Sequence, residues 1–523
     1  MDLFAFLVAL LVGAVFLTRV AAKLSMPYPA LLALGGAAVG LLPNIPRFEL
    51  DSQFALLVFV APALFIAACE VSPRDLKDNR LPIVTLVVAA VAVTTAAVAM
   101  VFHSLEPQVP WAAAIALGAI VSPPDAVAAT AVLRQVRIPH RILQILEGES
   151  LFNDASALLI FSIAVRVATQ GSDDIAPVAF AYVLSIFASV VAGLACVWLC
   201  VRLVAFVRDP ASSIVLQFCA VLGVWMLAEK LDLSPVLTIV AFGIGLMRFA
   251  VPGTDTVIRV QSRWVWRTAI FFTNVLGFTL LGFQLGPLLS PLTPAERSHY
   301  FVVALIVLAT VILVRLAWVL TFNTVLRSTY RAFPSRANRM FLRPSLRGSL
   351  VVGWSGMRGV LTLAAALALP AGFPERELIQ FVAFVVVLGT LLAQGLTLAP
   401  LVRILRLPND NQVDAETAFA RRKALEAGLQ ALEGETSAYA DALRIEYNAA
   451  LARWNDTGAL LASGLPTMEA SEHDLLHQRT VTASRQALAK LLTNGQIGTE
   501  AYFRVEEVLD RTELYTSRSV FRS

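Results

Sequence analysis

The stretch WAAAIALGAIVSPPDAVAATAVL, residues 111–133, is long and apolar enough to cross a lipid bilayer, yet two prolines stand in its middle. A bilayer core about 30 Å thick needs about 20 predominantly apolar helical residues. Pro123 and Pro124 remove two backbone donors, and each disfavours helical geometry in the residue before it. The stretch therefore predicts a membrane helix that is unwound at its midpoint, where free carbonyls can line a cavity.

The whole chain has the composition of a membrane protein. Of its 523 residues, 58% are hydrophobic and 15% are charged, against about 45–50% and about 25% in soluble proteins. The apolar runs are too long for barrel strands of about 10 residues. We expect an all-α polytopic membrane protein with about thirteen helices and inverted repeats. The helices are expected near residues 2–19, 27–43, 53–71, 81–104, 111–133, 143–166, 175–205, 211–230, 235–249, 264–289, 298–327, 347–371 and 374–405.

Loop charges predict the orientation. The loops after odd-numbered helices carry 22 Lys and Arg, and those after even-numbered helices carry 5. Cytoplasmic loops are enriched in these residues, so the N-terminus is expected outside and the C-terminus inside. Residues 1–407 hold 29 basic and 20 acidic residues, whereas residues 408–523 hold 12 and 17. We expect a transmembrane domain over 1–407 and a cytoplasmic helical domain over 408–523, with a break at Ser463–Pro466.

Six charged residues remain that the loops do not account for. Arg315 and Arg358 fall within predicted spans. The acids are Asp125, Glu149, Asp154 and, near the inner end of the third span, Glu70. An ionised side chain at the bilayer centre costs about 2.5–3.5 kcal/mol on insertion scales, so such residues persist mainly where they are paired or functional. Four acids facing two arginines leave an excess of negative charge.

The segment ESLFND, residues 149–154, gathers oxygen ligands near the membrane midplane. Ser150 and Asp154 are four residues apart and share a helix face, as do Glu149 and Asn153. A hydroxyl, an amide and a carboxylate together are hard oxygen ligands suited to a small alkali cation. We therefore expect the cation at Asp154.

A second interrupted helix is expected at Gly353–Gly359, where three glycines and an arginine occur in seven residues. The two interrupted helices are the fifth and the twelfth, and an odd offset of seven gives them opposite orientations. Inverted repeats with an ion site between discontinuous helices are typical of secondary transporters.

Three motifs resemble the signatures of the sodium/proton exchanger family, the electroneutral branch of the monovalent cation:proton antiporters. They are ESLFND at 149–154, SPPDAVA at 122–128 and WSGMRGV at 354–360. The resemblance extends over about residues 1–407, and the tail is similar to that of bacterial members. The pair Asn153-Asp154 is the most specific element, because the electrogenic branch carries Asp-Asp there.

The resemblance implies roles for individual residues. Asp154 would bind the ion and the proton, with Asn153 beside it, and the Ser150 hydroxyl and the Pro124 carbonyl would face the ion. Glu70 would match an acid that reaches the ion in some members. Two structural ion pairs are implied, Glu149 with Arg315 and Asp125 with Arg358. The sequence has Pro-Asp-Ala at 124–126 in place of the commoner Thr-Asp-Pro, so only a backbone role carries over at Pro124.

Together these features predict a secondary transporter that exchanges sodium for protons one for one, because a desolvated carboxylate is neutralised by either ion. The resemblance implies that it serves pH and sodium homeostasis in the bacterial inner membrane, among lipid, as a homodimer, and no cofactor is expected. A potassium/proton antiporter and a cation channel are the alternatives, and selectivity among sodium, potassium and lithium stays open. An enzyme is disfavoured, because Met357 replaces the last glycine of Gly-x-Ser-x-Gly. The tail could gate transport or bind a cytoplasmic regulator.

Overall fold

The computed structural model describes residues 2–24, 26–42, 56–134, 136, 138–170, 175–204, 206–207, 209–249, 256–290, 292–332, 345–407, 411–452 and 470–520. The described residues form helices joined by turns and contain no strand. The predicted all-α membrane fold is therefore confirmed.

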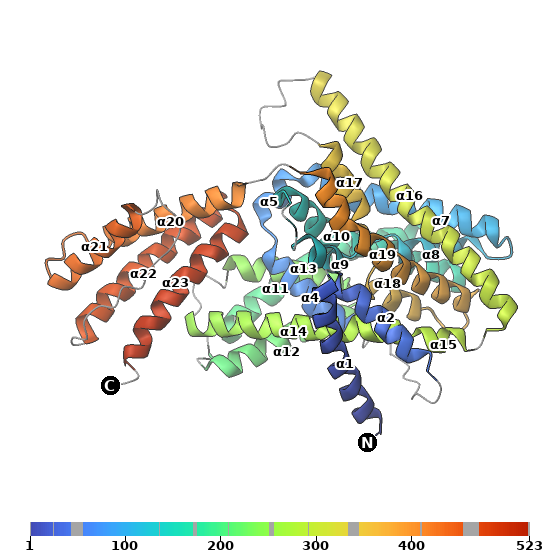
Figure 1. The fold of residues 1–523 in the computed structure, drawn as a ribbon, viewed down its shortest axis with the longest axis horizontal. Coiled ribbons are helices and arrows are strands. Elements are labelled where there is room, and N and C mark those ends of the chain that lie inside the picture. Colours follow the sequence, from blue (N-terminus) through green and yellow to red (C-terminus); the bar gives the residue numbers. More distant parts are fainter. Residues whose placement is uncertain are drawn as a thin grey trace.

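The helices of the first 407 residues follow the predicted apolar runs (Figure 1). They are α1 (Asp2–Leu24), α2 (Tyr28–Gly40), η1 (Leu56–Val60), α4 (Ala61–Glu70), α5 (Pro73–Asp78), α6 (Arg80–Val84), η2 (Thr85–Ala90), α7 (Val91–Leu105), α8 (Trp111–Val121), α9 (Ala126–Leu133), α10 (His140–Gln170), α11 (Ile175–Val204), α12 (Pro210–Lys230), α13 (Pro235–Phe249), α14 (Thr256–Phe283), α15 (Leu285–Leu289), α16 (Pro294–Ala332), α17 (Leu346–Trp354), α18 (Val360–Leu367) and α19 (Arg376–Leu405). Eight helical stretches among the described residues are long and apolar enough to cross a membrane, and three shorter apolar helices accompany them. The total of thirteen crossings stays a prediction.

Both interrupted helices occur where Pro and Gly predicted them. Residues 122–125 separate α8 from α9, and residues 355–359 separate α17 from α18. The interruptions lie inside the bundle, because Val121, Val351 and Met357 are fully buried. Unwound backbone at this depth is therefore surrounded by protein, as a membrane protein requires.

Three large apolar cores build the bundle, and α10 contributes to each of them. The first, which we call the α16 bundle, packs α7, α8, α16, α18 and α19 together. The second, the α13 bundle, packs α4, α11, α12 and α13 together. Helix α10 contributes Ala164 to the first core and Leu151 to the second. A third core packs α2, α9, α14, α17 and α19 against Ile142 and Leu146 of α10, so α10 lies along the boundary of all three.

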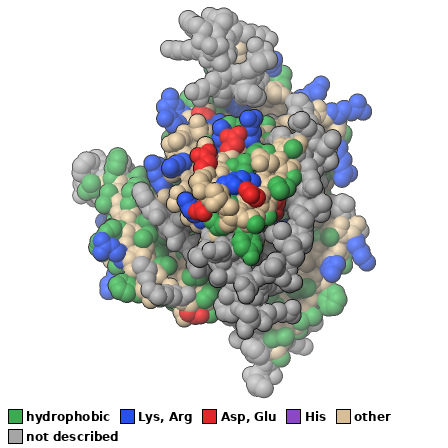
Figure 2. Space-filling model, turned by 90° about the vertical axis from the view of Figure 1, so that its left-hand side faces the viewer, with side chains coloured by type: hydrophobic (Ala, Val, Ile, Leu, Met, Phe, Trp, Pro, Cys, Tyr) green, Lys and Arg blue, Asp and Glu red, His purple; other side chains and the backbone are tan. Residues whose placement is uncertain are grey.

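The tail forms a separate group of helices at one end of the molecule (Figure 1). They are α20 (Gln412–Gln430), α21 (Ala438–Ala452), α22 (Ala470–Thr493) and α23 (Thr499–Val520). Small apolar cores hold α20, α22 and α23 together, and α20 and α21 together. Figure 2 views this end and shows acidic and basic side chains intermixed on it, with hydrophobic side chains on the surfaces to either side. The predicted break at Ser463–Pro466 lies outside the described residues.

Buried ion pairs join the tail to the membrane bundle. Arg259 of α14 lies 2.5 Å from Asp510 and 3.5 Å from Glu506, both on α23, and these two acids are 1% and 0% exposed. Arg263 adds a contact of 3.0 Å to Glu506. Burial raises the pKa of the Glu506 carboxyl, and Arg259 opposes that shift. The tail is thus held to α14 by charges that water does not screen.

Candidate cation site

The two interruptions bond to each other through backbone groups. The Asp125 amide donates to the Met357 carbonyl at 2.6 Å. The Arg358 amide donates to the Thr390 hydroxyl of α19 at 3.0 Å. Each unwound segment thereby satisfies polar groups that its own helix has given up, which explains how both interruptions persist inside the bundle.

The Arg358 side chain caps the end of the first half-helix. It is fully buried, and its Nε donates to the Val121 carbonyl at 2.9 Å and its Nη2 to the Ser122 carbonyl at 3.3 Å. Its Nη1 donates to Gly356. Carbonyls at a helix C-terminus carry partial negative charge and have no partner within the helix. A guanidinium with its donors in a fixed fork meets that need.

Asp125 caps the other half-helix, which corrects the expected ion pair with Arg358. Its Oδ1 accepts from the Val127 amide at 2.8 Å, as an N-cap residue does at the start of α9. The structure records no ion pair between these two described side chains. The helix ends are the reason: the broken helix exposes a negative end to the arginine and a positive end to the aspartate. Each charge is therefore compensated by a helix terminus.

Helix α10 brings its polar face to the same interruption. The Ser150 hydroxyl accepts from the Ala126 amide at 3.3 Å, and the Asn153 amide donates to the Pro124 carbonyl at 3.3 Å. Asn153 is fully buried, and its Oδ1 has no hydrogen-bond partner. An unbonded buried oxygen beside a backbone carbonyl and a hydroxyl is an arrangement that a cation can use.

Glu149 and Arg315 form a buried pair on the adjacent face of α10. Two parallel bonds join them, Nη1 to Oε1 at 2.5 Å and Nη2 to Oε2 at 2.9 Å. The side chains are 1% and 3% exposed. Nη2 also donates to the Val352 carbonyl of α17 at 3.3 Å. The structure thus brings together the two residues whose pairing the resemblance implied, and the pair ties α10 to α16 and α17.

Asp154 is the acid that remains. It is 9% exposed, and no described basic side chain forms an ion pair with it. It shares its helix face with Ser150. When all are ionised, the three acids of the site exceed its two arginines by one negative charge. The acids are Asp125, Glu149 and Asp154, and the arginines are Arg315 and Arg358. One monovalent cation or one proton neutralises this excess charge.

A comparison with protein families identifies the family of this chain. The sequence profile described as "Sodium/hydrogen exchanger, transmembrane" matches residues 6–404. The chain belongs to the sodium/hydrogen exchanger family. The exchanger's relatives are transporters rather than enzymes, as the sequence predicted.

The exchanger is similar to several bacterial proteins. It is 28% identical to a sodium, potassium, lithium and rubidium/H(+) antiporter of Bacillus subtilis, over 94% of this chain and 74% of that protein. It is 32% identical to an uncharacterized Na(+)/H(+) exchanger of Mycobacterium tuberculosis, over 82% and 79% of the two chains. The fold resembles that of a sodium proton antiporter of Methanocaldococcus jannaschii, with a TM-score of 0.55, 18% identity and coverage of 76% of this chain and 100% of that chain.

Glu70 is not brought to Asp154 in the exchanger. It ends α4 at the bundle surface, its side chain is 47% exposed, and its carboxylate lies 3.5 Å from Arg134. The resemblance placed this acid at the ion. The sequence already put it near the inner end of the span, too far along the helix to share the depth of Asp154.

Sequence reasoning missed two residues of the site. Thr390 holds the backbone of Arg358, and Gly359 packs against the Asp125 carboxylate. Polar residues within the last apolar run were the available signal, because buried polar groups in a membrane span are seldom without a role. Nothing in the sequence pointed to Gly359 as the neighbour of Asp125.

Replacing Gly359 with alanine is expected to destabilise the exchanger by ~1–3 kcal/mol, the usual range for overpacking. A Cβ added to Gly359 would overlap the Asp125 side chain, because it would lie 2.8 Å from the Asp125 Cβ. The cap of α9 and the crossing of the interruptions must then shift. Gly223→Ala is the matched control, since a Cβ there meets no atom within 4 Å. Thermal unfolding in detergent gives the comparison, and equal melting of the two variants would contradict this packing.

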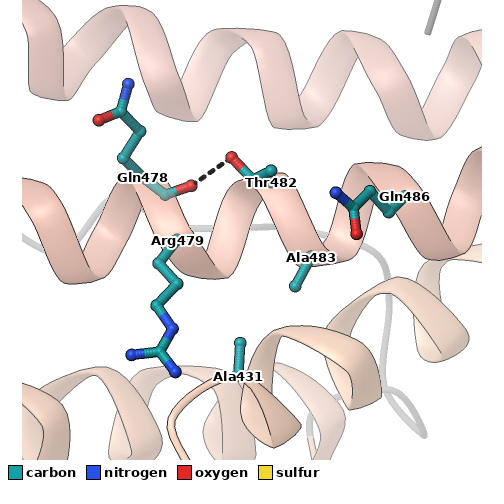
Figure 3. A pocket seen from close by; sticks show the side chains of 6 residues that line it. All are labelled: Ala431, Gln478, Arg479, Thr482, Ala483 and Gln486. Atoms are coloured by element: carbon teal, nitrogen blue, oxygen red, sulfur yellow. Dashed lines mark hydrogen bonds between the residues drawn. The ribbon is translucent and has the colours of Figure 1, made fainter.

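The tail contains a separate hollow of about 560 Å³. Figure 3 shows that Gln478, Arg479 and Gln486 project from one helix around it, with Ala431 on another. Arg479 already pairs with Glu435 at 2.9 Å. Six residues line the hollow and none of them is an acid. It therefore lacks a carboxylate like that of Asp154 in the candidate cation site.

Proposed function

We propose that the exchanger carries out sodium/proton exchange at Asp154, with Asn153, Ser150 and the Pro124 carbonyl supplying the other oxygens. One observation carries the proposal: Glu149 has Arg315 and Asp125 has a helix terminus, whereas Asp154 has no described basic partner. Sodium and the proton compete for the same carboxylate, so binding one releases the other.

The charge balance of the site supports electroneutral, one-for-one exchange. With either ion bound, the five charged side chains and their cargo sum to zero. The empty site carries one net negative charge, which is costly to move through a low-dielectric region. The site therefore changes its access from one side of the membrane to the other when sodium or a proton is bound, and not when it is empty. The sodium and proton fluxes are coupled as a result.

Transport in proteoliposomes tests the proposal. Purified exchanger is reconstituted with an internal pH dye, and sodium is added at clamped membrane potential. We expect sodium to drive proton movement that saturates with concentration and does not change with the potential. Flux that never saturates would indicate a channel, and flux that follows the potential would exclude one-for-one exchange.

A broader monovalent selectivity is the second candidate. The relative from Bacillus subtilis is described as an antiporter of sodium, potassium, lithium and rubidium. The proposed ligands are all oxygens, which bind any alkali cation and leave the choice to cavity size. The same liposome assay with each chloride salt in turn ranks the ions directly.

We further propose that residues 408–523 form a cytoplasmic domain docked on α14, with the N-terminus on the opposite side. The excess of basic loop residues on one side supports this orientation. The exchanger would then act in the bacterial inner membrane in pH and sodium homeostasis. A homodimer and a cytoplasmic regulator of the tail remain predictions.

Neutralising two acids of the docking interface is expected to release the tail. The variant Glu506→Gln/Asp510→Asn removes the two carboxylates that lie 3.5 and 2.5 Å from Arg259, and breaking a buried pair costs about 3–5 kcal/mol. Limited proteolysis of the segment between residues 405 and 412 should become at least about tenfold faster. The control is Glu507→Gln, an exposed neighbour that pairs with Arg511 on its own helix. Equal cleavage rates would show that these pairs do not hold the tail.

A further inference from the structure

Three charged side chains meet where α4, α9 and α10 come together. Arg134 directly follows α9, and its Nη2 lies 3.5 Å from Glu70 Oε2 and 3.5 Å from Glu147 Oε1. One guanidinium thus bridges two carboxylates from different helices. We call Glu70, Arg134 and Glu147 the latch.

The latch joins α4 of the α13 bundle to α9 and α10. Glu70 ends α4, which belongs to the α13 bundle. Arg134 ends the second half of the broken helix that carries Asp125, and Glu147 lies on α10. Any movement of the broken helix and α10 relative to the α13 bundle changes the distance between Arg134 and Glu70.

The latch also lies in line with the proposed cation site. Glu147, Ser150 and Asp154 are at positions i, i+3 and i+7 of α10, which share one helix face. Seven residues correspond to about 10.5 Å along the axis. His140, the first residue of the same helix, lies 3.3 Å from Glu500 of the tail, so the latch is on the side of the membrane bundle that faces the tail.

The exposure of the three side chains suits a contact that opens and closes. Arg134 is 62% exposed, Glu70 47% and Glu147 28%, so the cluster runs from water toward the interior. Exposed ion pairs contribute little to stability, so thermal motion can break this bridge in every transport cycle. The pair of Glu149 and Arg315, by contrast, is buried and joined by two bonds.

We propose that Arg134 is a positioning residue of the exchange cycle, whose bridge between Glu147 and Glu70 closes the tail-side route to Asp154. The bridge breaks when that route opens and forms again when the loaded site turns away. This inference rests on the proposed cation site at Asp154. It assigns to Glu70 a role in access to the site rather than in ion coordination.

Accessibility of a thiol at Ser150 tests the latch without measuring transport. The four native cysteines, Cys69, Cys196, Cys200 and Cys219, are replaced, and Ser150→Cys is introduced. A membrane-impermeant maleimide is applied from the tail side of inside-out vesicles. We expect Arg134→Gln to raise the labelling rate at least about threefold, Arg134→Lys to keep the original rate, and the tail-surface control Arg422→Gln to have no effect.

Unchanged labelling in Arg134→Gln would overturn the latch, whatever its transport kinetics. Because labelling does not require sodium to bind at Asp154, this failure is distinct from failure of the proposed site. Kinetics add a second readout. Without the bridge the open state should be more populated, which lowers the tail-side sodium KM at least about threefold and reduces the maximal rate. A purely structural defect instead lowers the amount of folded protein and leaves KM unchanged.

Discussion

Replacing Asp154 with asparagine is expected to reduce sodium-driven proton flux to less than about one hundredth of the original rate. The amide cannot take up and release a proton, and it carries no charge to hold a cation. The site changes from one net negative charge to none, so it no longer attracts sodium or a proton. No other described acid of the site is free to replace it, because Glu149 is bonded to Arg315 and Asp125 caps α9.

Proteoliposomes with an internal pH dye measure this effect. The matched control is Glu377→Gln, the same chemical change at an exposed acid in the first turn of α19. It should transport normally. Asp154→Asn should melt at the same temperature as the original protein or higher, since a buried carboxylate without a basic partner has been removed. Full exchange by a well-folded Asp154→Asn protein would place the cation elsewhere.

Replacing Arg315 with methionine is expected to destabilise the exchanger by about 3–5 kcal/mol. The change leaves the Glu149 carboxylate 1% exposed and without its two bonds of 2.5 and 2.9 Å. Methionine retains much of the side-chain volume, so the loss reports on the charge rather than on a cavity. The Val352 carbonyl loses a donor as well.

A double variant separates this explanation from poor packing. Arg315→Met/Glu149→Gln removes both charges, and it should recover most of the lost stability because no ionised group is left buried. Melting temperatures in detergent give the comparison, with Arg422→Met as a control at an exposed pair. If the double variant melts no higher than the single one, the pair is not what stabilises this region.

Local chemistry explains why so much of the fold could be predicted. Proline removes a donor wherever it stands, so the interruption at Pro123 and Pro124 follows from two adjacent residues. The length of an apolar run measures a bilayer crossing without reference to neighbours. The same holds for Ser150 and Asp154, whose spacing places them on one face of any helix.

The partners of charged groups could not be predicted in the same way. Arg358 binds carbonyls at the end of α8, more than two hundred residues away in sequence, and Asp125 caps its own half-helix. A count of acids and arginines cannot distinguish an ion pair from a helix terminus that supplies the opposing charge. The partner of Glu70 likewise depends on where α4 ends relative to α9. Neither helix's own sequence specifies that position.

The sequence by itself determined the membrane class, the two interrupted helices, the polar face of α10 and an excess of acids over arginines within the spans. Each depends on residue type and spacing along one helix. Only the tertiary structure decided which group opposes each of the other charges: Arg315 for Glu149, helix termini for Asp125 and Arg358, and Arg134 for Glu70. Electrostatic partners are set by distance in space, and helices far apart in the chain bring them within reach.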